Sequence, residues 1–368
     1  MLARVAEVQV KHDFCYLSNP HATELFLKYF KRDFRDAEKL HVLVGHYPSQ
    51  NRALAEKVAV FLKHPLLLSP SKEGEKQDIS VANIFVGNGA TEIIQAVLHN
   101  FAEEKILIPI PTFSPYLEFA PKGVKVVCHQ LNKEDDFRLN LKKLLTQIQK
   151  KKPDTVVVIN PNNPDGSYHF ANDLQNFLAK LTTVKTVIVD ESFTHFTGTK
   201  IESVAPLVKK YPNLIVIKSL SKDFGIAGLR LGYAVMSEKR VSALLERGYL
   251  WNVSGFGEYF LNLLSDKAFL KEYEAARLKA IGGRDDFFKA LQKVEGIKVY
   301  PSKANAFLIE LLDGTKAGHL MVRLLSRHGI YIRTCYDKVG LEGEFVRIAS
   351  RTKAENDFFV SALHTILL

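Results

Sequence analysis

Short runs of aliphatic and β-branched residues recur along the first two thirds of the chain, and amphipathic stretches separate them. These runs predict buried strands at residues 84–86, 105–109, 124–130, 155–159, 185–189 and 214–218. Stretches with a helical period predict helices at residues 23–34, from Asn51 onward, at 139–149 and at 172–180. Strands that alternate with helices predict an α/β fold with a mostly parallel sheet wrapped by helices.

The last third of the chain has a different pattern. Helical periodicity dominates residues 237–294, and short strands and helices then alternate at 297–300, 306–311, 316–328, 330–333 and 345–348, before a closing helix. We therefore predict a small α/β domain. The expected organisation is an N-terminal segment at residues 1–44 that joins the small domain, a large domain at 45–270 and a small C-terminal domain at 271–368.

Polar clusters follow several of the predicted parallel strands. The turn Gly87-Asn-Gly89-Ala90-Thr91 follows the first, an Asn- and Pro-rich turn follows residues 155–159, and Asp190 ends the run at 185–189. Ligands of open α/β sheets bind beyond the carboxyl ends of the strands, so these clusters indicate one composite site. A helix that starts at a glycine turn binds phosphate well, although such a turn also needs glycine for its conformation alone.

The stretch from Ser219 to Arg230 is the densest of these clusters. A desolvated lysine such as Lys222 loses its proton more easily and then attacks a carbonyl. The hydroxyls of Ser219 and Ser221 and the planar fork of Arg230 are suited to a phosphate. An aldehyde and a phosphate on one small molecule describe pyridoxal phosphate. The alternative is a solvated loop in which the lysine has no special role.

Composition limits the remaining function classes. The chain has 46% hydrophobic and 24% charged residues, a net charge of +10 and a pI of about 9.2. The densest basic run, Lys150–Lys152, lies at a predicted helix end, where cations complement the helix dipole. A small anionic substrate therefore explains the charge better than nucleic acid does, which remains the alternative from another class. Three widely spaced cysteines without metal-ligand spacing and no membrane-length apolar run favour a cytoplasmic protein without a metal site.

Taken together, these motifs resemble the fold-type-I pyridoxal-phosphate aminotransferases, most closely the histidinol-phosphate aminotransferases and the related threonine-phosphate decarboxylases. The resemblance extends from Tyr16 to Thr352. Its specificity comes from order and spacing, since Asn163 and Asp190 are 27 positions apart and Lys222 and Arg230 are 8 apart.

The resemblance implies a role for each cofactor residue. Lys222 would bind the cofactor covalently and later move the proton, Asp190 would pair with the pyridine nitrogen, and Asn163 would bind the phenolic oxygen. Phe113 would stack on the ring, and Tyr47 would reach the phosphate of the neighbouring subunit in a homodimer with shared active sites. The remaining phosphate contacts would come from Gly89, Ala90, Thr91, Ser219, Ser221 and Arg230.

The resemblance also implies a substrate and a reaction. Arg347 would hold the substrate carboxylate with a bidentate fork, and Arg333 would hold a second anion, unless it is only a surface arginine. This predicts an aminotransferase for a small, anionic and possibly phosphorylated amino acid or amine. The alternative is an amino-acid decarboxylase of the threonine-phosphate-decarboxylase type. The chain departs from the aminotransferase pattern at Phe193, where a tyrosine is usual.

Overall fold

A seven-stranded sheet forms the centre of the larger lobe. The computed structural model describes residues 9–65, 67–68 and 79–367. The strands lie in the order β3-β10-β9-β7-β6-β4-β5, and only β10 runs antiparallel to its neighbours. The mostly parallel sheet confirms the predicted fold class. The strands are β3 (Ile84–Gly87), β4 (Lys105–Ile110), β5 (Lys125–Gln130), β6 (Thr155–Ile159), β7 (Thr186–Asp190), β9 (Leu214–Ser219) and β10 (Gly232–Val235).

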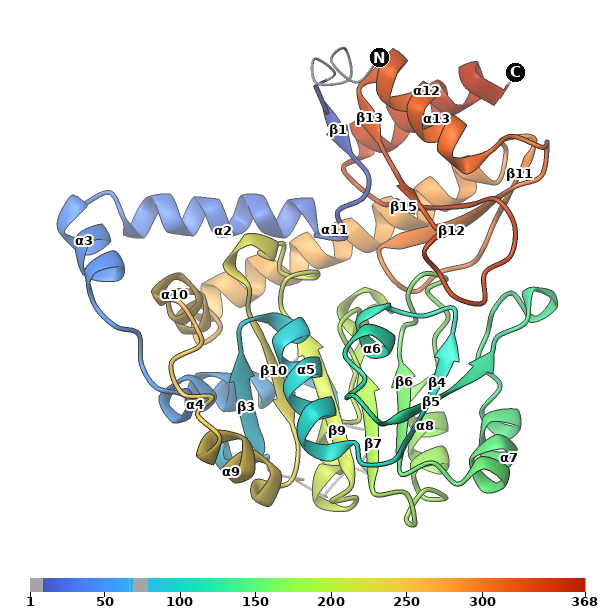
Figure 1. The fold of residues 1–368 in the computed structure, drawn as a ribbon. Helices are drawn as coiled ribbons and strands as arrows, with labels where there is room; N and C mark the ends of the chain where they lie inside the picture. The colour runs from blue at the N-terminus through green and yellow to red at the C-terminus, as the bar shows by residue number, and fades with distance from the viewer. Residues whose placement is uncertain (1–8, 66, 69–78, 368) are drawn as a thin grey trace.

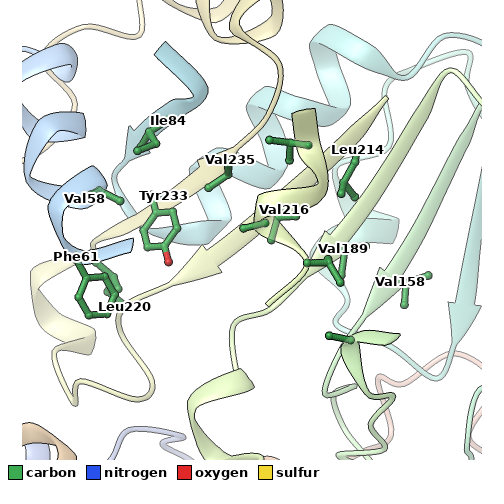
Figure 2. Close-up of a cluster of buried hydrophobic side chains, with 14 of the residues drawn as sticks. Val58, Phe61, Ile84, Val158, Val189, Leu214, Val216, Leu220, Tyr233 and Val235 are labelled. Atoms are coloured by element: carbon green, nitrogen blue, oxygen red, sulfur yellow. The ribbon is translucent and has the colours of Figure 1, made fainter. Parts of the chain in front are cut away.

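Helices cover both faces of this sheet, because the central strands have apolar side chains at consecutive positions and neighbouring side chains point to opposite faces. Val187 and Val189 belong to one core and Ile188 to the other. Figure 2 shows Val189 and Val216 in the first core, with Val58 of α4. The first core takes in α4 (Asn51–Leu62), α7 (Leu141–Lys151), α8 (Ala171–Leu178) and α10 (Gly255–Leu263), and the second takes in α5 (Gly89–Phe101), α6 (Pro115–Glu118) and α9 (Glu238–Glu246).

The smaller lobe has its own sheet and its own core (Figure 1). Its antiparallel strands lie in the order β11-β12-β15-β14, and the register places Arg333 opposite Arg347. The predicted strand at residues 330–333 is split, because β13 pairs with the N-terminal β1 whereas β14 pairs with β15. The elements are β11 (Ile297–Val299), β12 (Ala306–Leu311), α12 (Ala317–His328), β13 (Ile330–Tyr331), β14 (Arg333–Thr334), β15 (Phe345–Ala349) and α13 (Lys353–Leu367).

One long helix, α11 (Lys267–Leu291), passes from one lobe to the other. Its residue Tyr273 packs in the core of the large lobe, whereas Phe287 and Leu291 pack in that of the small lobe. The predicted domain boundary after residue 270 falls within this helix. Figure 1 shows α2 beside α11. The other elements are β1 (His12–Asp13), α2 (Pro20–Asp33), α3 (Ala37–Gly45), β2 (Leu67–Leu68), β8 (Ile201–Glu202) and 3₁₀ turns at Val81–Asn83, Lys133–Asp135, Thr194–Phe196, Ala205–Lys209 and Ala227–Leu229.

Helix α2 begins at Pro20 because Asn19 caps it. The Asn19 side-chain oxygen accepts hydrogen bonds from the amides of His21 and Ala22, at 3.0 and 3.3 Å. Within the described part of the chain, every helix is too short or too polar to cross a membrane.

Candidate active site

A cavity of about 160 Å³ lies at the carboxyl ends of the large-lobe strands, against the small lobe. The structure brings most of the predicted site residues to it. Those that line it are Ala90, Thr91, Phe113, Asn163, Asp190, Ser219, Lys222, Arg230 and Arg347, and the further lining residues are Cys15, Tyr16, Leu17, Ile159, Ser192 and Phe193. The predicted residues Gly89 and Ser221 lie directly beside lining residues and contact Arg230.

The loop after β9 holds Lys222 in the cavity. The N-terminal segment fixes this loop, because the Asn19 amide donates to the Lys222 carbonyl at 2.8 Å and the Ser18 hydroxyl donates to the Ser221 carbonyl at 3.2 Å. Asp223 is fully buried beside it, paired with Lys218. Burial, followed by the positive charges of Arg347 and Arg230, lowers the pKa of Lys222 to about 8. Its amine therefore loses its proton near physiological pH.

Asp190 is the last residue of β7 and is 3% exposed. Its two carboxylate oxygens accept hydrogen bonds from the Tyr116 hydroxyl, at 2.8 Å, and from the Ser192 amide, at 2.9 Å. Burial raises the pKa of Asp190, and the hydrogen bonds from Ser192 and Tyr116 oppose that rise. The contact with Tyr116 could not be predicted from the sequence, because the two residues are 74 positions apart.

Gly89 and Arg230 form one corner of the cavity. Gly89 has a φ of +83°, and a Cβ there would lie 2.6 Å from Nη2 of Arg230. Glycine is therefore needed both for this backbone conformation and for the space that the guanidinium takes. Arg230 also donates to the Ser221 hydroxyl at 3.4 Å. The amino end of α5 begins at Gly89, so its unpaired N–H groups and the guanidinium face a common space that suits an anion.

Arg347 extends from β15 of the small lobe to the opposite side of the cavity. Its Nη1 donates to Oδ1 of Asn163 at 2.9 Å, and its Nη2 donates to the Cys15 carbonyl at 3.3 Å. Its buried Nε has no hydrogen-bond partner among the described residues. Both of its partners are neutral, so the guanidinium lacks a carboxylate and is available to an anionic ligand.

Two further cations lie beside Arg347. Arg333 does not line the cavity, and its Nη2 pairs with Asp337 at 2.7 Å. Lys338, which was not among the predicted site residues and does not line the cavity either, donates to the Ser114 hydroxyl at 2.8 Å. Ser114 directly follows Phe113, which lines the cavity. No spacing in the sequence could relate residues 114 and 338.

Tyr47 lies away from the cavity of its own chain. It follows α3 and is 94% exposed. All described residues of α3 are at least partly exposed, including Val42 and Val44. The structure therefore gives Tyr47 no contact with the predicted site residues of the same subunit.

The residues of this cavity suit pyridoxal phosphate. A lysine with a lowered pKa faces the same space as a buried carboxylate, and Gly89 leaves room for a guanidinium beside a helix amino end. Lys222 would hold the aldehyde, Asp190 the ring nitrogen and the corner at Arg230 the phosphate. Together these groups match the three polar ends of that cofactor.

Comparison with known proteins gives the same family. A family model for aminotransferase class I and II matches residues 29–363. An L-serine phosphate decarboxylase of Campylobacter jejuni subsp. jejuni is 47% identical over 370 residues, which covers 99% of this chain and 90% of that protein. A histidinol-phosphate aminotransferase of Caldanaerobacter subterraneus subsp. tengcongensis is 35% identical over 297 residues, 78% of this chain and 79% of that protein. The solved structure of a decarboxylase from Sulfurospirillum multivorans matches with a TM-score of 0.91 and 44% identity, covering 99% and 90% of the two chains.

These findings contradict our prediction of an aminotransferase. The relatives at 47% and 44% identity are decarboxylases, so the comparisons favour the alternative. That prediction assigned the substrate carboxylate to Arg347 and a second anion to Arg333, and these two assignments stay predictions. The structure adds Lys338 beside them, so a substrate with two anions need not present its carboxylate to Arg347.

Three predictions are confirmed: the family that the motifs resemble, the fold class and the cofactor. The matched model covers most of the chain, and relatives above 30% identity extend over more than two thirds of it. The chain belongs to the aminotransferase class I and II family and is a pyridoxal-phosphate-dependent enzyme of the α/β fold that this family shares.

Proposed function

We propose that this protein is a decarboxylase of O-phospho-L-serine, which it converts to O-phosphoethanolamine and carbon dioxide. The observation that carries the proposal is the 47% identity to the Campylobacter decarboxylase across 99% of the chain. The cations on the small-lobe side of the cavity support it, because a phosphorylated amino acid brings a carboxylate and a phosphate together.

The cofactor residues have the roles that the resemblance implies. Lys222 binds the cofactor and Asp190 pairs with its ring nitrogen. Pyridoxal phosphate acts as an electron sink for the electron pair that is left on Cα when a bond to it breaks. Asn163 would hold the phenolic oxygen and Phe113 would pack on the ring. The cofactor phosphate is held by Gly89, Ala90, Thr91, Ser219, Ser221 and Arg230.

The orientation of the substrate decides which bond to Cα breaks. With the cofactor bound, its electron-sink chemistry would favour cleavage of whichever bond to Cα the protein aligns with the cofactor's π system. We assign the substrate phosphate to Arg347 and Arg333, which leaves the carboxylate free to take the aligned position. The bond from Cα to the carboxylate carbon then breaks, carbon dioxide leaves, and Lys222 supplies the proton that Cα takes up.

Product analysis tests this proposal. The purified enzyme, loaded with pyridoxal phosphate, is incubated with O-phospho-L-serine, L-serine and O-phospho-L-threonine. We expect carbon dioxide and O-phosphoethanolamine in equal amounts from the first compound, with the cofactor unchanged, and much slower release from L-serine. Conversion of the cofactor to pyridoxamine phosphate without carbon dioxide would exclude a decarboxylase. Faster release from O-phospho-L-threonine would assign the enzyme to a different substrate.

We also propose a homodimer in which Tyr47 contacts the cofactor phosphate of the neighbouring subunit. Its 94% exposure and the exposed apolar residues of α3 support a contact with a second copy. Mixing Tyr47→Ala and Lys222→Ala proteins tests this, since exchange of subunits should restore a fraction of intact sites. Heterodimers without activity would contradict a shared site. The three free cysteines fit a reducing compartment, and we place the protein in the cytoplasm.

A further inference from the structure

Lys338 lies in the loop between β14 and β15, and its burial is the reverse of what a surface loop normally shows. The lysine is 8% exposed, whereas its apolar neighbours Tyr336 and Val339 are 60% and 54% exposed. Lysine is rarely buried unless it is paired with an opposite charge. The loop therefore buries its charged side chain and exposes its apolar side chains. A buried charge of this kind is expected to bind a ligand or to have a structural partner.

The partners of Lys338 do not neutralise it. Its Nζ donates to the neutral Ser114 hydroxyl at 2.8 Å, and the nearest carboxylate, Asp337, is 3.7 Å away and already pairs with Arg333 at 2.7 Å. An ammonium group has three donors, so further hydrogen bonds remain to be made. Burial lowers the pKa of Lys338 most and Asp337 opposes that shift, while the positive charges of Arg347 and Arg333 lower the pKa further.

The three neighbouring cations carry more charge than their surroundings balance. Among the described residues, Asp337 is the one carboxylate that forms an ion pair with Arg333 or Lys338, and Arg347 forms none. Three positive charges against one negative charge leave an excess of two. A phosphate dianion would balance this excess, and it offers acceptor oxygens to several donors at once.

The loop is fixed between the two lobes, so Lys338 has a defined position. The Lys338 amide donates to the Cys335 carbonyl at 3.0 Å, and its carbonyl accepts from the Leu341 amide at 3.1 Å. The Gln130 side chain, on β5 of the large lobe, donates to the Gly340 carbonyl at 2.8 Å. The Ser114 contact brings the ammonium group next to the cavity wall at Phe113.

We propose that Lys338 is a specificity-determining residue that binds the phosphate of the substrate, exchanging its bond to Ser114 for bonds to phosphate oxygens. This inference rests on the proposed function. It explains why the lysine of this loop is buried. The substrate phosphate would then be bound by Arg347, Arg333 and Lys338 together. The competing interpretation is that Lys338 only ties the loop to Ser114.

The two interpretations make opposite predictions for a pair of variants. Lys338→Gln removes the charge but keeps a side-chain N–H that can donate to Ser114, whereas Ser114→Ala removes the acceptor and keeps the charge. Calorimetric titration of the holoenzyme with the product O-phosphoethanolamine measures phosphate binding without turnover. We expect Lys338→Gln to weaken this binding about tenfold to a hundredfold, as for loss of one charged hydrogen bond, and Ser114→Ala to change it less than about threefold.

Lys316→Gln is the matched control. Lys316 lies in the same lobe, is 62% exposed and pairs with Glu344 at 3.1 Å. This variant therefore removes the same charge from an exposed position outside the cavity. We expect it to bind O-phosphoethanolamine within about twofold of the wild type. Thermal unfolding and the cofactor absorbance of each variant confirm that it is folded and loaded. Lys338→Met serves as a second charge-free variant and should weaken the binding at least as much as Lys338→Gln.

Activity separates failure of this inference from failure of the proposed function. A wild-type enzyme that releases no carbon dioxide from O-phospho-L-serine would overturn both. A wild-type enzyme that does so, with Lys338→Gln binding O-phosphoethanolamine as tightly as the wild type, would overturn only the role of Lys338. Weaker binding by Ser114→Ala than by Lys338→Gln would establish the structural tie instead.

Discussion

The two sides of the cavity are built differently. On the large-lobe side, Asp190 ends a central strand and accepts two hydrogen bonds, and Lys222 sits in a loop held by the N-terminal segment. On the small-lobe side, Arg347 bonds only neutral acceptors, and the nearby Arg333 and Lys338 share one carboxylate. On the first side, the carboxylate of Asp190 has its hydrogen-bond partners within the protein, and an anion is lacking only at the Arg230 corner. The second side has three cations and one carboxylate. We infer that the first side performs the chemistry common to the family and that the second chooses the substrate and the bond that breaks.

The largest test of this division is Lys222→Ala. If the large-lobe side performs the chemistry, this variant should lose carbon dioxide release by at least about a thousandfold, because both the covalent attachment and the proton donor are removed. Its binding of O-phosphoethanolamine should remain within about tenfold of the wild type. Borohydride reduction and peptide mapping of the wild type should place the cofactor on Lys222. Modification of a different lysine would refute the assignment.

Arg347→Ala probes the opposite side. We expect kcat/KM for O-phospho-L-serine to fall by about a hundredfold, the scale for loss of a charged bidentate contact, while the protein still binds its cofactor. Arg333→Ala should cost less, because Arg333 is 41% exposed and already paired with Asp337. Steady-state kinetics with the phosphorylated and the unphosphorylated amino acid measure both effects. Equal losses with L-serine would show that Arg347 does not recognise the phosphate.

A smaller effect is expected where the cofactor phosphate would bind. Gly89→Ala would place a Cβ 2.6 Å from Nη2 of Arg230, and the arginine would have to move. We expect the dissociation constant of pyridoxal phosphate to rise about tenfold, with substrate recognition by the small-lobe side unaffected. Gly123→Ala is the control, because Gly123 also has a positive φ, of +93°, but a Cβ there would meet no atom within 4 Å. A similar rise in both variants would point to backbone strain rather than to Arg230.

The contrast between the two sides also explains what could be predicted from the sequence. Strand β6 has the predicted bounds, Thr155–Ile159, and Asp190 was placed correctly at a strand end, because buried strands leave a continuous apolar signal. Contacts between distant segments leave no such signal. The hydrogen bond from Tyr116 to Asp190 and the one from Lys338 to Ser114 both join segments that only the folded chain brings together. The reaction was also predicted wrongly, and it was corrected by the decarboxylases at 47% and 44% identity rather than by any motif of the chain.

The smallest expected effect concerns the loss of folding stability that results from burying the amine of Lys222 in the cavity. Its pKa of about 8, against the usual 10.5, means that below pH 8 the folded protein without cofactor holds a charged amine in an unfavourable position. Between pH 8 and 10.5 the unfolded chain binds more protons than the folded one, so the contribution of Lys222 to stability rises with pH in that window. Lys222→Met apoprotein should therefore unfold with a free energy on the order of 1–3 kcal/mol above that of the wild-type apoprotein at pH 7, from a shift of a few units at about 1.4 kcal/mol each. Denaturant titrations from pH 7 to 10.5 should show this difference shrinking, and Lys239→Met, at an exposed position on α9, is the control for removing a lysine outside the cavity. If the difference in free energy of unfolding between Lys222→Met and the wild type did not change with pH, the cavity without cofactor would solvate the amine as well as water solvates a surface lysine. The large-lobe side would then be less preorganised in the absence of its ligand than its hydrogen bonds indicate.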